Sequence, residues 1–390
     1  MKIALMIERF DRSGGGLEQW TWALARALAE RGHAITVLAF RAPAAAPSFV
    51  DLILLPWHTS RLTRASTADR MLASLDVDVA HDLGIGCAAP LLHPQSGSRL
   101  ANERREAQGS GWLRRILAWA HPRRRHWLHE MRQFENRRYD PPSDNLVIAV
   151  SRMVAADLAA WHRVAADRVR LVPNGIDTSR FFPPAPAIRE RWRRRFALEG
   201  KTAFLFSAHN PRLKGLPSLL EAFARVRSDR KDLALLVIGK KPDRETLRIV
   251  RRHRLQDAVL FPGLVADTMP YYAAADAFVL PSWHDACSLT VLEACGCGLP
   301  VITTRSNGVA DLLTDGREGR IIDNAGDIDA LATAIVELCD PDVRAGMAVH
   351  AVETARRNDF CNNVDAVERV YEEVARRDRL VAHRHDGGSP

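Results

Sequence analysis

The chain has 390 residues, of which 47% are hydrophobic and 26% charged, and this composition predicts two domains with full hydrophobic cores. It contains no run of 18 apolar residues, so a transmembrane helix is not expected, and its six cysteines lack the paired spacing of a disulfide framework or a zinc site. The cysteines therefore indicate a reducing cytoplasm, and the net charge of +8 indicates an anionic partner without saying which one.

The first half of the chain alternates predicted strands with predicted helices. It begins with a strand at residues 3–7, in a segment that is too short and too soon charged to be a signal peptide. A glycine-rich turn follows, and then a helix over residues 17–31. Further strands are expected at residues 35–40, 52–55, 79–81 and 169–172, with a helix around 154–161 before the last of them. Such alternation is typical of a doubly wound parallel sheet.

The second half repeats this pattern after a crossing at residues 173–184, which are rich in turn residues and proline. Its strands are expected at residues 203–207, 233–238, 259–261, 277–280 and 301–303. The final helices are expected to run from residue 328 to about 375. The polar tail at 381–390 is expected to be disordered.

Residues 281–300 hold two carboxylates, Asp285 and Glu293, eight positions apart around a predicted helix start. Ser288 is the expected N-cap, because its hydroxyl can accept from the amides of the first turn. Asp285 would lie in the loop ahead of these amides, and Glu293 about one turn inside the helix. Exposed amides and the helix dipole favour a phosphate, and carboxylates on either side can accept hydrogen bonds from sugar hydroxyls. The segment therefore predicts a site for a nucleoside-diphosphate sugar.

This segment closely resembles the acidic-x7-acidic signature of the retaining glycosyltransferases of family 4, which have the GT-B fold. The resemblance implies that Glu293 binds the nucleotide ribose and that Asp285, named as a catalytic and substrate-binding residue, contacts hydroxyls of the transferred sugar. It also implies that the amides of Ser288, Leu289 and Thr290 hold the diphosphate. The first acid is usually a glutamate in this family, and a displacement near 1 Å at a reacting centre can cost on the order of a hundredfold in rate unless the loop compensates.

The resemblance spans nearly the whole chain and is closest to the bacterial lipopolysaccharide core glucosyltransferases. It implies an α/β protein with two Rossmann-like, doubly wound domains that face each other across a cleft. The expected bounds are 1–175 for the acceptor-side domain, 176–355 for the nucleotide-sugar domain, 356–380 for a helix that packs back on the first domain, and 381–390 for the tail.

Two further segments suit the donor diphosphate. Gly15 and Gly16 belong to the glycine-rich turn, where the backbone can approach a ligand closely and adopt positive φ, although an ordinary tight turn would have the same residues. Arg212 and Lys214 follow the first strand of the second domain, and two cations there suit a pyrophosphate and the charge on a leaving nucleotide. The resemblance favours the ligand-binding interpretation of both segments, although the family spaces its arginine and lysine more widely. A solvated basic loop is the alternative for the second.

The residue that moves a proton is sought in residues 80–98, where the family carries an aspartate or a histidine near the reacting sugar. His93 is the candidate catalytic residue, for acceptor contact or proton transfer, with His81 and Asp82 as alternatives and a purely structural histidine as a third. The D-x-D pattern at residues 76–78 lies at a strand entry and lacks the context of a metal motif. We therefore expect metal-independent chemistry with no cofactor. The resemblance implies UDP-glucose or a close relative as the donor.

Residues 104–138 interleave arginines with tryptophans. Trp112, Ile116 and Trp119 fall on one face of a predicted helix, with Arg114 and Arg115 alongside. Such a face suits an anionic membrane surface, the phosphates and bases of a nucleic acid, or the interior of an ordinary helical hairpin. The resemblance favours the membrane, and a nucleic acid is the least favoured of the three.

Together these features predict a retaining glycosyltransferase in the cytoplasm, peripheral on the inner face of the cell membrane. It would move glucose or a similar hexose to lipopolysaccharide core or to another surface glycan or lipid-linked acceptor. Two alternatives remain: a sugar-nucleotide epimerase of similar fold, and a catalytically silent nucleotide-sugar-binding protein, which the presence of Asp285 in place of glutamate keeps open.

Overall fold

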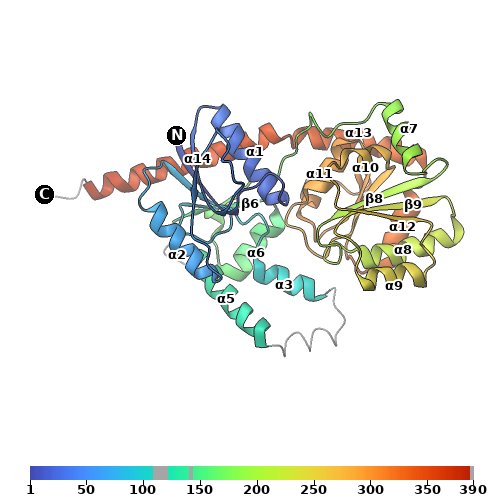
Figure 1. The fold of residues 1–390 in the computed structure, drawn as a ribbon, viewed down its shortest axis with the longest axis horizontal. Coiled ribbons are helices and arrows are strands. Elements are labelled where there is room, and N and C mark those ends of the chain that lie inside the picture. Colours follow the sequence, from blue (N-terminus) through green and yellow to red (C-terminus); the bar gives the residue numbers. More distant parts are fainter. Residues whose placement is uncertain (109–121, 140–143, 387–390) are drawn as a thin grey trace. The chain divides into compact units, whose positions relative to one another are not determined.

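The computed structural model describes residues 1–108, 122–139 and 144–386, which form two α/β units (Figure 1). The chain passes from the first unit to the second between Pro173 and Asn174 and returns between Cys361 and Asn362, and residues 104–108 are also grouped with the second unit. Each unit is built on one sheet whose strands all pair in parallel. The predicted pair of doubly wound sheets is thus confirmed.

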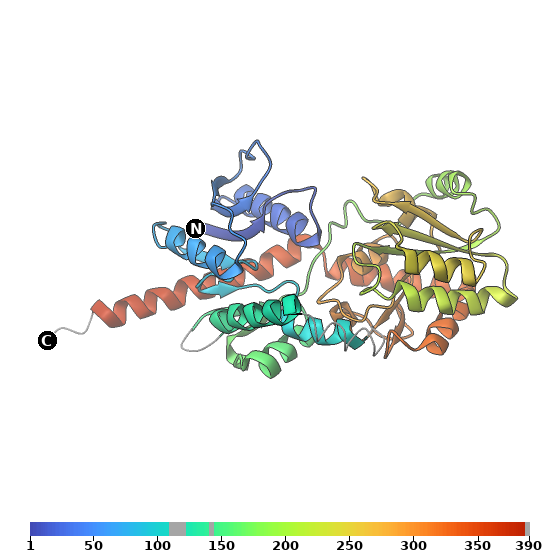
Figure 2. The same ribbon diagram turned by 60° about the horizontal axis from the view of Figure 1, so that its bottom comes forward.

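The first sheet has seven strands in the order β3-β2-β1-β4-β5-β6-β7. These strands are β1 (Lys2–Arg9), β2 (Ala34–Arg41), β3 (Asp51–Leu54), β4 (Val79–Asp82), β5 (Leu91–Leu92), β6 (Leu146–Ala149) and β7 (Val169–Leu171). The helices of this unit include α1 (Gly16–Glu30), α2 (Arg61–Leu72), α5 (Pro122–Tyr139), α6 (Arg152–His162) and, from Asn362 on, α14 (Phe360–Asp386). The first half of α3 (Arg99–Gln108) also belongs to it, whereas residues 104–108 are grouped with the second unit. Figures 1 and 2 show α5 and α6 side by side. The central strands of the sheet bury apolar side chains on both faces, as is typical of parallel strands covered by helices.

Helix α14 packs against the rest of the first unit through polar contacts as well as apolar ones. The indole Nε1 of Trp20 donates to Oδ1 of Asn363 over 2.9 Å, and a ring nitrogen of His33 lies 2.7 Å from Oε1 of Glu368. Further along, Arg170 pairs with Glu373. The helix continues to Asp386, past residue 380 where we expected it to end, because its helical pattern is not interrupted by glycine or proline before Gly387.

The second sheet has six strands in the order β10-β9-β8-β11-β12-β13. They are β8 (Thr202–Ala208), β9 (Leu233–Gly239), β10 (Val259–Gly263), β11 (Ala277–Leu280), β12 (Val301–Thr304) and β13 (Gly319–Ile322). Helices α7 (Pro186–Arg195), α8 (Leu216–Asp229), α9 (Arg244–Arg252), α10 (Met269–Ala274), α11 (Leu289–Gly296), α12 (Ile328–Glu337) and α13 (Pro341–Arg357) surround it. In Figure 1, α8, α9 and α12 lie on one side of the sheet and α10 and α11 on the other.

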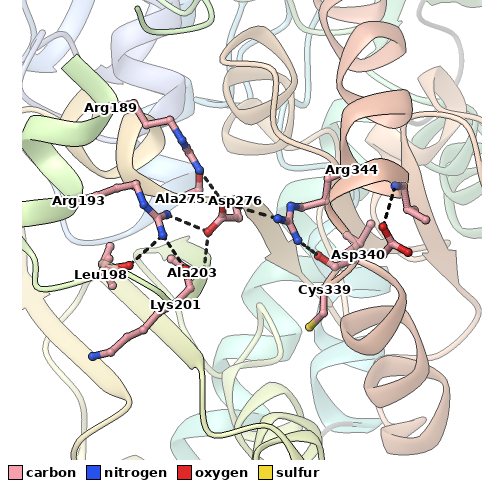
Figure 3. Close-up of polar contacts among 12 residues, drawn as sticks. Arg189, Arg193, Leu198, Lys201, Ala203, Ala275, Asp276, Cys339, Asp340 and Arg344 are labelled. Atoms are coloured by element: carbon pink, nitrogen blue, oxygen red, sulfur yellow. Dashed lines mark hydrogen bonds and ion pairs between the residues drawn. The ribbon is translucent and has the colours of Figure 1, made fainter. Parts of the chain in front are cut away.

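One carboxylate, that of Asp276, holds the amino-terminal end of β11 (Figure 3). Its Oδ1 lies 2.5 Å from Nη2 of Arg189 and 3.9 Å from Arg344, and its Oδ2 lies 2.9 Å from Nη1 of Arg193. Oδ2 also accepts the backbone N–H of Ala203 over 2.7 Å, which ties β11 to β8. The two α7 guanidinium groups donate in addition to the carbonyls of Leu198, Lys201, Ala273, Ala274 and Ala275. We call this arrangement the Asp276 clamp.

The sequence did not indicate three of the strands, β5, β6 and β13. β5 has only two residues, too few for any periodicity, and β6 is a four-residue apolar run that a buried helix could equally contain. β13 contains Gly319 at φ +153°, where a Cβ atom would lie 1.9 Å from the carbonyl oxygen of Val301. That glycine marks a close approach of two strands, which only the folded sheet reveals.

Candidate active site

The loop between β11 and α11 is held in place by its own backbone. Its residue Asp285 donates its N–H to the carbonyl of Ser306 over 3.0 Å and accepts the N–H of Gly308 over 2.8 Å. The N–H of Ser288 lies 3.3 Å from Oδ1 of Asn307, a fully buried residue. These bonds fix the loop against the segment that follows β12, so the start of α11 is positioned before any ligand arrives.

The first turn of α11 presents unpartnered amides. Leu289, Thr290 and Val291 donate their backbone N–H groups to no acceptor among the described residues. Ser288 is the N-cap residue, but our expectation that its hydroxyl bonds to these amides is wrong, because its Oγ lies 3.0 Å from the hydroxyl of Thr290 instead. The free donors and the positive end of the helix dipole together form a site for an anion.

Lys214 and Asp285 lie together beside this turn. Nζ of Lys214 is 2.6 Å from Oδ2 of Asp285 and 3.2 Å from the carbonyl of His284, and both side chains of the pair are largely buried. The next residue, Gly215, has φ +81°, and a Cβ there would lie 2.0 Å from the carbonyl oxygen of Pro281. Only glycine fits at that point, and this explains why the lysine is followed by glycine.

Glu293 is held by a buried tyrosine. The hydroxyl of Tyr272 donates to Oε2 of Glu293 over 2.7 Å and lies 3.3 Å from the carbonyl of Thr290. Burial raises the pKa of Glu293, and the Tyr272 hydroxyl and the charge of Arg180 oppose that shift only in part. The tyrosine occupies one carboxylate oxygen and leaves the other, Oε1, without a partner among the described residues.

Arg212 has a different partner from Lys214. Its Nη1 lies 3.0 Å from Oε2 of Glu245, in the first turn of α9, and both side chains are more than one third exposed. The structure thus brings Lys214, Asp285 and the α11 turn together, and it places Arg212 in a separate ion pair.

His93 lies directly after β5 in the first unit and is almost fully buried. Its ring stacks on that of His81 at 5.2 Å and meets the edge of Trp20 at 5.0 Å. Neither of its ring nitrogens has a hydrogen-bond partner among the described residues, and burial holds its pKa well below the ordinary value, so the ring is neutral at pH 7. The alternative His81 bonds to the hydroxyl of Tyr371 over 2.8 Å.

Asp82, the second alternative, is fully engaged in the fold. Its carboxylate accepts the N–H groups of Gly84, Ile85 and Gly86 at 2.7 to 3.0 Å and lies 2.9 Å from the guanidinium of Arg138. Those bonds shape the loop that follows β4, so Asp82 has no free oxygen to offer a substrate.

The glycine-rich turn after β1 does not use positive φ, contrary to our expectation. Gly15 is the N-cap of α1 with φ −75°, and Gly14 and Gly16 also lie outside the left-handed region. The turn needs small residues for another reason, because a Cβ at Gly14 would lie 2.7 Å from the side chain of Glu18.

No group of three or more His, Cys, Asp or Glu side chains among the described residues is arranged to hold a metal ion. In the D-x-D segment, Asp76 pairs with the side chain of Lys2 over 2.5 Å, and Asp78 accepts the N–H of the same residue. Both carboxylates thus bind Lys2, the first residue of β1.

Part of the basic segment, residues 104–138, lies outside the residues that the structure describes. Trp112, Ile116 and Trp119, with Arg114 and Arg115, lie outside the described residues. On α5, three arginines form ion pairs within the first unit: Arg124 with Glu103, Arg137 with Asp69, and Arg138 with Asp82. The run of basic residues in the sequence did not indicate this structural role. No helix in the described part of the chain is both long and apolar enough to cross a membrane.

Two residues of this site were not indicated by the sequence. Tyr272 precedes the strand that leads to the loop, and Asn307 follows β12, so neither is close in sequence to the residues it contacts. In the sequence, a tyrosine beside alanines is typical of a core residue. No spacing pattern distinguishes such a tyrosine from one that binds a carboxylate of the site.

Known proteins similar to this chain share its two-unit organisation. The family described as "Glycosyltransferase Family 4" matches residues 14–180, and the one described as "Glycosyl transferases group 1" matches residues 200–340. A GDP-mannose-dependent alpha-(1-6)-phosphatidylinositol monomannoside mannosyltransferase of Mycolicibacterium smegmatis is 31% identical over 299 residues, covering 74% of each chain. A D-inositol 3-phosphate glycosyltransferase of Corynebacterium jeikeium is 28% identical, covering 68% of this chain and 69% of its own length.

Solved structures show the same fold. WaaG, a glycosyltransferase involved in lipopolysaccharide biosynthesis, superimposes with a TM-score of 0.78 at 22% identity, covering 95% of this chain and 99% of its own. Anabaena HepE in complex with UDP and glucose gives a TM-score of 0.73 at 18% identity, with the same coverage. At such identities the likeness establishes the architecture, with its two Rossmann-like domains, and not the substrate.

Proposed function

The chain belongs to glycosyltransferase family 4 and is a glycosyltransferase of the GT-B type, and on this premise we propose that it transfers a hexose, with retention of configuration, from a nucleoside-diphosphate sugar to a cell-surface glycan or lipid-linked acceptor. The observation that carries the proposal is the first turn of α11, where the unpartnered amides of Leu289, Thr290 and Val291 lie beside the Lys214–Asp285 pair.

The donor diphosphate would bind at this turn. Its oxygens would accept hydrogen bonds from the three amides and from Lys214, which would stabilise the charge that builds on the nucleotide as the bond to the sugar breaks. Asp285, with Oδ1 unengaged among the described residues, would accept a hydroxyl of the transferred sugar. Oε1 of Glu293 would accept a ribose hydroxyl while Tyr272 holds Oε2. No step in this scheme requires a metal ion.

The first donor we propose is UDP-glucose, with lipopolysaccharide core or a similar surface glycan as acceptor. GDP-mannose is the second, because a relative at 31% identity is named as GDP-mannose-dependent. Inositol phosphates and phosphatidylinositol glycosides join the list of acceptors to test, because the names of the two similar enzymes contain them.

His93 is our proposal for acceptor contact or proton transfer. A neutral, buried imidazole with two free ring nitrogens can accept a proton from a hydroxyl or donate a hydrogen bond to it. His81 has one nitrogen engaged by Tyr371, and Asp82 has none of its oxygens free, so both are weaker candidates.

Contact with the inner face of the cell membrane is proposed for residues 104–138. On α5, Arg125 and Arg132 are exposed and pair with no carboxylate among the described residues, so they are available to anionic lipid headgroups. This surface would bring the enzyme to a lipid-linked acceptor.

The test is nucleotide release from a panel of UDP-, GDP-, ADP- and dTDP-sugars, with and without a glycolipid extract as acceptor. The wild type is compared with Glu293→Gln and with Glu199→Gln, a control at an exposed glutamate of the same unit. Release from one donor that the extract stimulates, that Glu293→Gln abolishes and that Glu199→Gln leaves intact supports the transferase and identifies its donor.

Two other outcomes would replace the proposal. Conversion of a sugar nucleotide without any acceptor would indicate an epimerase. Nucleotide binding without turnover of any donor would indicate a silent binding protein, and Asp285→Glu would then be the variant to make next.

A further inference from the structure

One peptide group just ahead of α11, the group between Cys287 and Ser288, is held by two buried asparagine side chains. Nδ2 of Asn174 donates to the carbonyl oxygen of Cys287 over 2.8 Å, and Oδ1 of Asn307 accepts the N–H of Ser288 over 3.3 Å. Asn174 is 6% exposed and Asn307 is fully buried. Because a peptide group is planar, bonds to its oxygen and to its nitrogen together fix its orientation. We call these two residues the asparagine pair.

The side-chain amide of Asn307 has a partner at both of its ends. Its Oδ1 also accepts the N–H of Val309 over 3.3 Å, and its Nδ2 donates to the hydroxyl of Thr303 over 3.1 Å. A backbone N–H can only donate, so the amide oxygen has to face Ser288 and Val309 while the nitrogen faces Thr303. Neither an aspartate nor a leucine of similar size could serve both ends, because a carboxylate lacks the donor and a leucine lacks donor and acceptor.

Thr303 connects this amide to the end of β11. Its hydroxyl accepts from Asn307 and donates to the carbonyl of Leu280, the last residue of β11, over 3.1 Å. The next residue, Thr304, donates its hydroxyl to the carbonyl of Ser282 over 2.6 Å, and both threonines are fully buried on β12. Hydrogen bonds in such a chain strengthen one another where the dielectric constant is low. Buried polar groups of β12 therefore support the loop between β11 and α11.

The asparagine pair determines which amides a ligand can use. The N–H of Ser288 is already engaged by Asn307. The free donors of this turn are the N–H groups of Leu289, Thr290 and Val291, which have no acceptor in the part of the chain that the structure describes. An anion at the start of α11 thus meets these three donors and not that of Ser288, so its position along the helix is set by where the free donors begin.

The same segment also holds the acid that we propose to bind the sugar. The backbone of Asp285 bonds to Ser306 and Gly308, and its carboxylate pairs with Lys214. Asn307 lies between these two anchors and forms a parallel bridge with Asp285. A diphosphate that moved one amide back along the turn would change its distance from both Asp285 and Lys214. A displacement near 1 Å at a reacting centre can cost on the order of a hundredfold in rate.

We propose that Asn307 and Asn174 are positioning residues for the donor, which withhold the N–H of Ser288 from the ligand and confine the diphosphate to the three free amides. This inference rests on the proposed function, because it explains how the same site places its substrate for transfer. Neither asparagine contacts the donor in this scheme. Both act through the peptide group that precedes the site, so their removal should lower the rate of transfer more than the affinity for nucleotide.

The first test follows the amides themselves, without catalysis. Hydrogen exchange at single residues is measured on the full chain, alone and with each of UDP, GDP, ADP and dTDP. In the wild type, nucleotide should slow exchange at Leu289, Thr290 and Val291 and leave Ser288 unchanged. In Asn307→Ala, nucleotide should slow exchange at Ser288 as well, because the freed N–H can then bind the diphosphate. Protection of Ser288 by nucleotide in the wild type, or no protection of the other three amides by any nucleotide, would overturn the proposal.

The second test separates rate from affinity. In Asn307→Ala, kcat for transfer should fall about tenfold or more, because the diphosphate can take a second position. The dissociation constant of the nucleoside diphosphate should change less than about threefold, because the freed N–H of Ser288 adds a donor to the turn. Asn174→Ala acts on the other side of the same peptide group and should give the same pattern, so the test does not depend on the folding of one variant. Thr303→Val, which removes only a hydroxyl, should lower kcat less than Asn307→Ala does.

The control is Thr354→Val, which removes another fully buried hydroxyl of the same unit, one that donates to Glu318. It should lower Tm and leave kcat unchanged. If kcat and nucleotide affinity fall together in both asparagine variants, or if kcat is unchanged in both, the proposal is wrong. If the wild type turns over no donor, the proposed function fails, and hydrogen exchange still decides whether the N–H of Ser288 is withheld from nucleotide.

Discussion

Two aspartates at opposite ends of β11 have different hydrogen-bonding environments. At the amino-terminal end, both oxygens of Asp276 are filled by two arginines of α7 and by the N–H of Ala203 (Figure 3). Beyond the carboxyl end, Asp285 has one oxygen on Lys214, and its other oxygen accepts nothing from the described residues. A saturated carboxylate holds the fold together, whereas one with an open oxygen can bind a substrate. Hydrogen-bond saturation, more than burial, therefore distinguishes the structural end of this strand from the end where we propose that the substrate binds.

The sharpest test of this comparison is a matched pair of substitutions, Asp276→Ala and Asp285→Ala. Removal of Asp276 leaves two guanidinium groups partly buried without a countercharge, so we expect a loss of about 3–5 kcal/mol in the free energy of unfolding. Removal of Asp285 should cost less, because it leaves one cation rather than two, and Lys214 keeps its hydrogen bond to the carbonyl of His284. Urea unfolding of both variants measures the difference, and equal losses would contradict the division of roles.

The next largest effect concerns activity. Lys214→Ala should lower kcat by about 10²–10³-fold, because it removes one charged donor from the departing diphosphate. Its thermal stability should stay close to that of the wild type. Lys231→Ala, at an exposed lysine before β9, is the matched control, and Arg212→Ala should have a smaller effect than Lys214→Ala because Glu245 already engages that arginine. A lysine variant with full activity would remove Lys214 from the chemistry.

A smaller effect is expected from Tyr272→Phe, which removes a single hydroxyl from the carboxylate of Glu293. Nucleotide binding should weaken about tenfold, the cost of one hydrogen bond to a charged group. The same substitution in a Glu293→Gln background should cost less, because the two residues act through one contact. Equilibrium titration of the wild type, the two single variants and the double variant with nucleoside diphosphate measures the coupling between the two residues. If the losses of binding free energy are additive, the Tyr272 hydroxyl does not act through Glu293.

The sequence predicted the α11 side of this comparison because its residues are close together along the chain. A strand, a loop acid, a helix start and a second acid fall within 20 positions, and each has a local signature. The pairing of Lys214 with Asp285 was not foreseen, because the two residues lie 71 positions apart and each was assigned a separate ligand.

The Asp276 clamp escaped prediction for the same reason. Arg189 and Arg193 belong to a helix with five arginines in ten residues, which reads as a solvated surface until the fold brings Asp276 to it from more than 80 positions away. Local patterns predict helices and loops, but the partner of a charged side chain is decided by topology.

The last prediction is the smallest and concerns Glu293, which combines both kinds of role. Its pKa is raised by burial, so the folded state binds a proton more tightly than the unfolded chain does, and ionisation of this group opposes folding. Above the raised pKa, Glu293→Gln should therefore be more stable than the wild type, although it binds nucleotide less well. As the pH falls through that pKa, the wild type becomes protonated and the stability difference should shrink. Urea unfolding between pH 4 and 8, with Glu199→Gln as control, measures this trend. If Glu293→Gln is less stable than the wild type at pH 8, the carboxylate of Glu293 stabilises the fold, as that of Asp276 does. The idea that this buried carboxylate destabilises the folded state and is retained to bind a ligand would then be wrong.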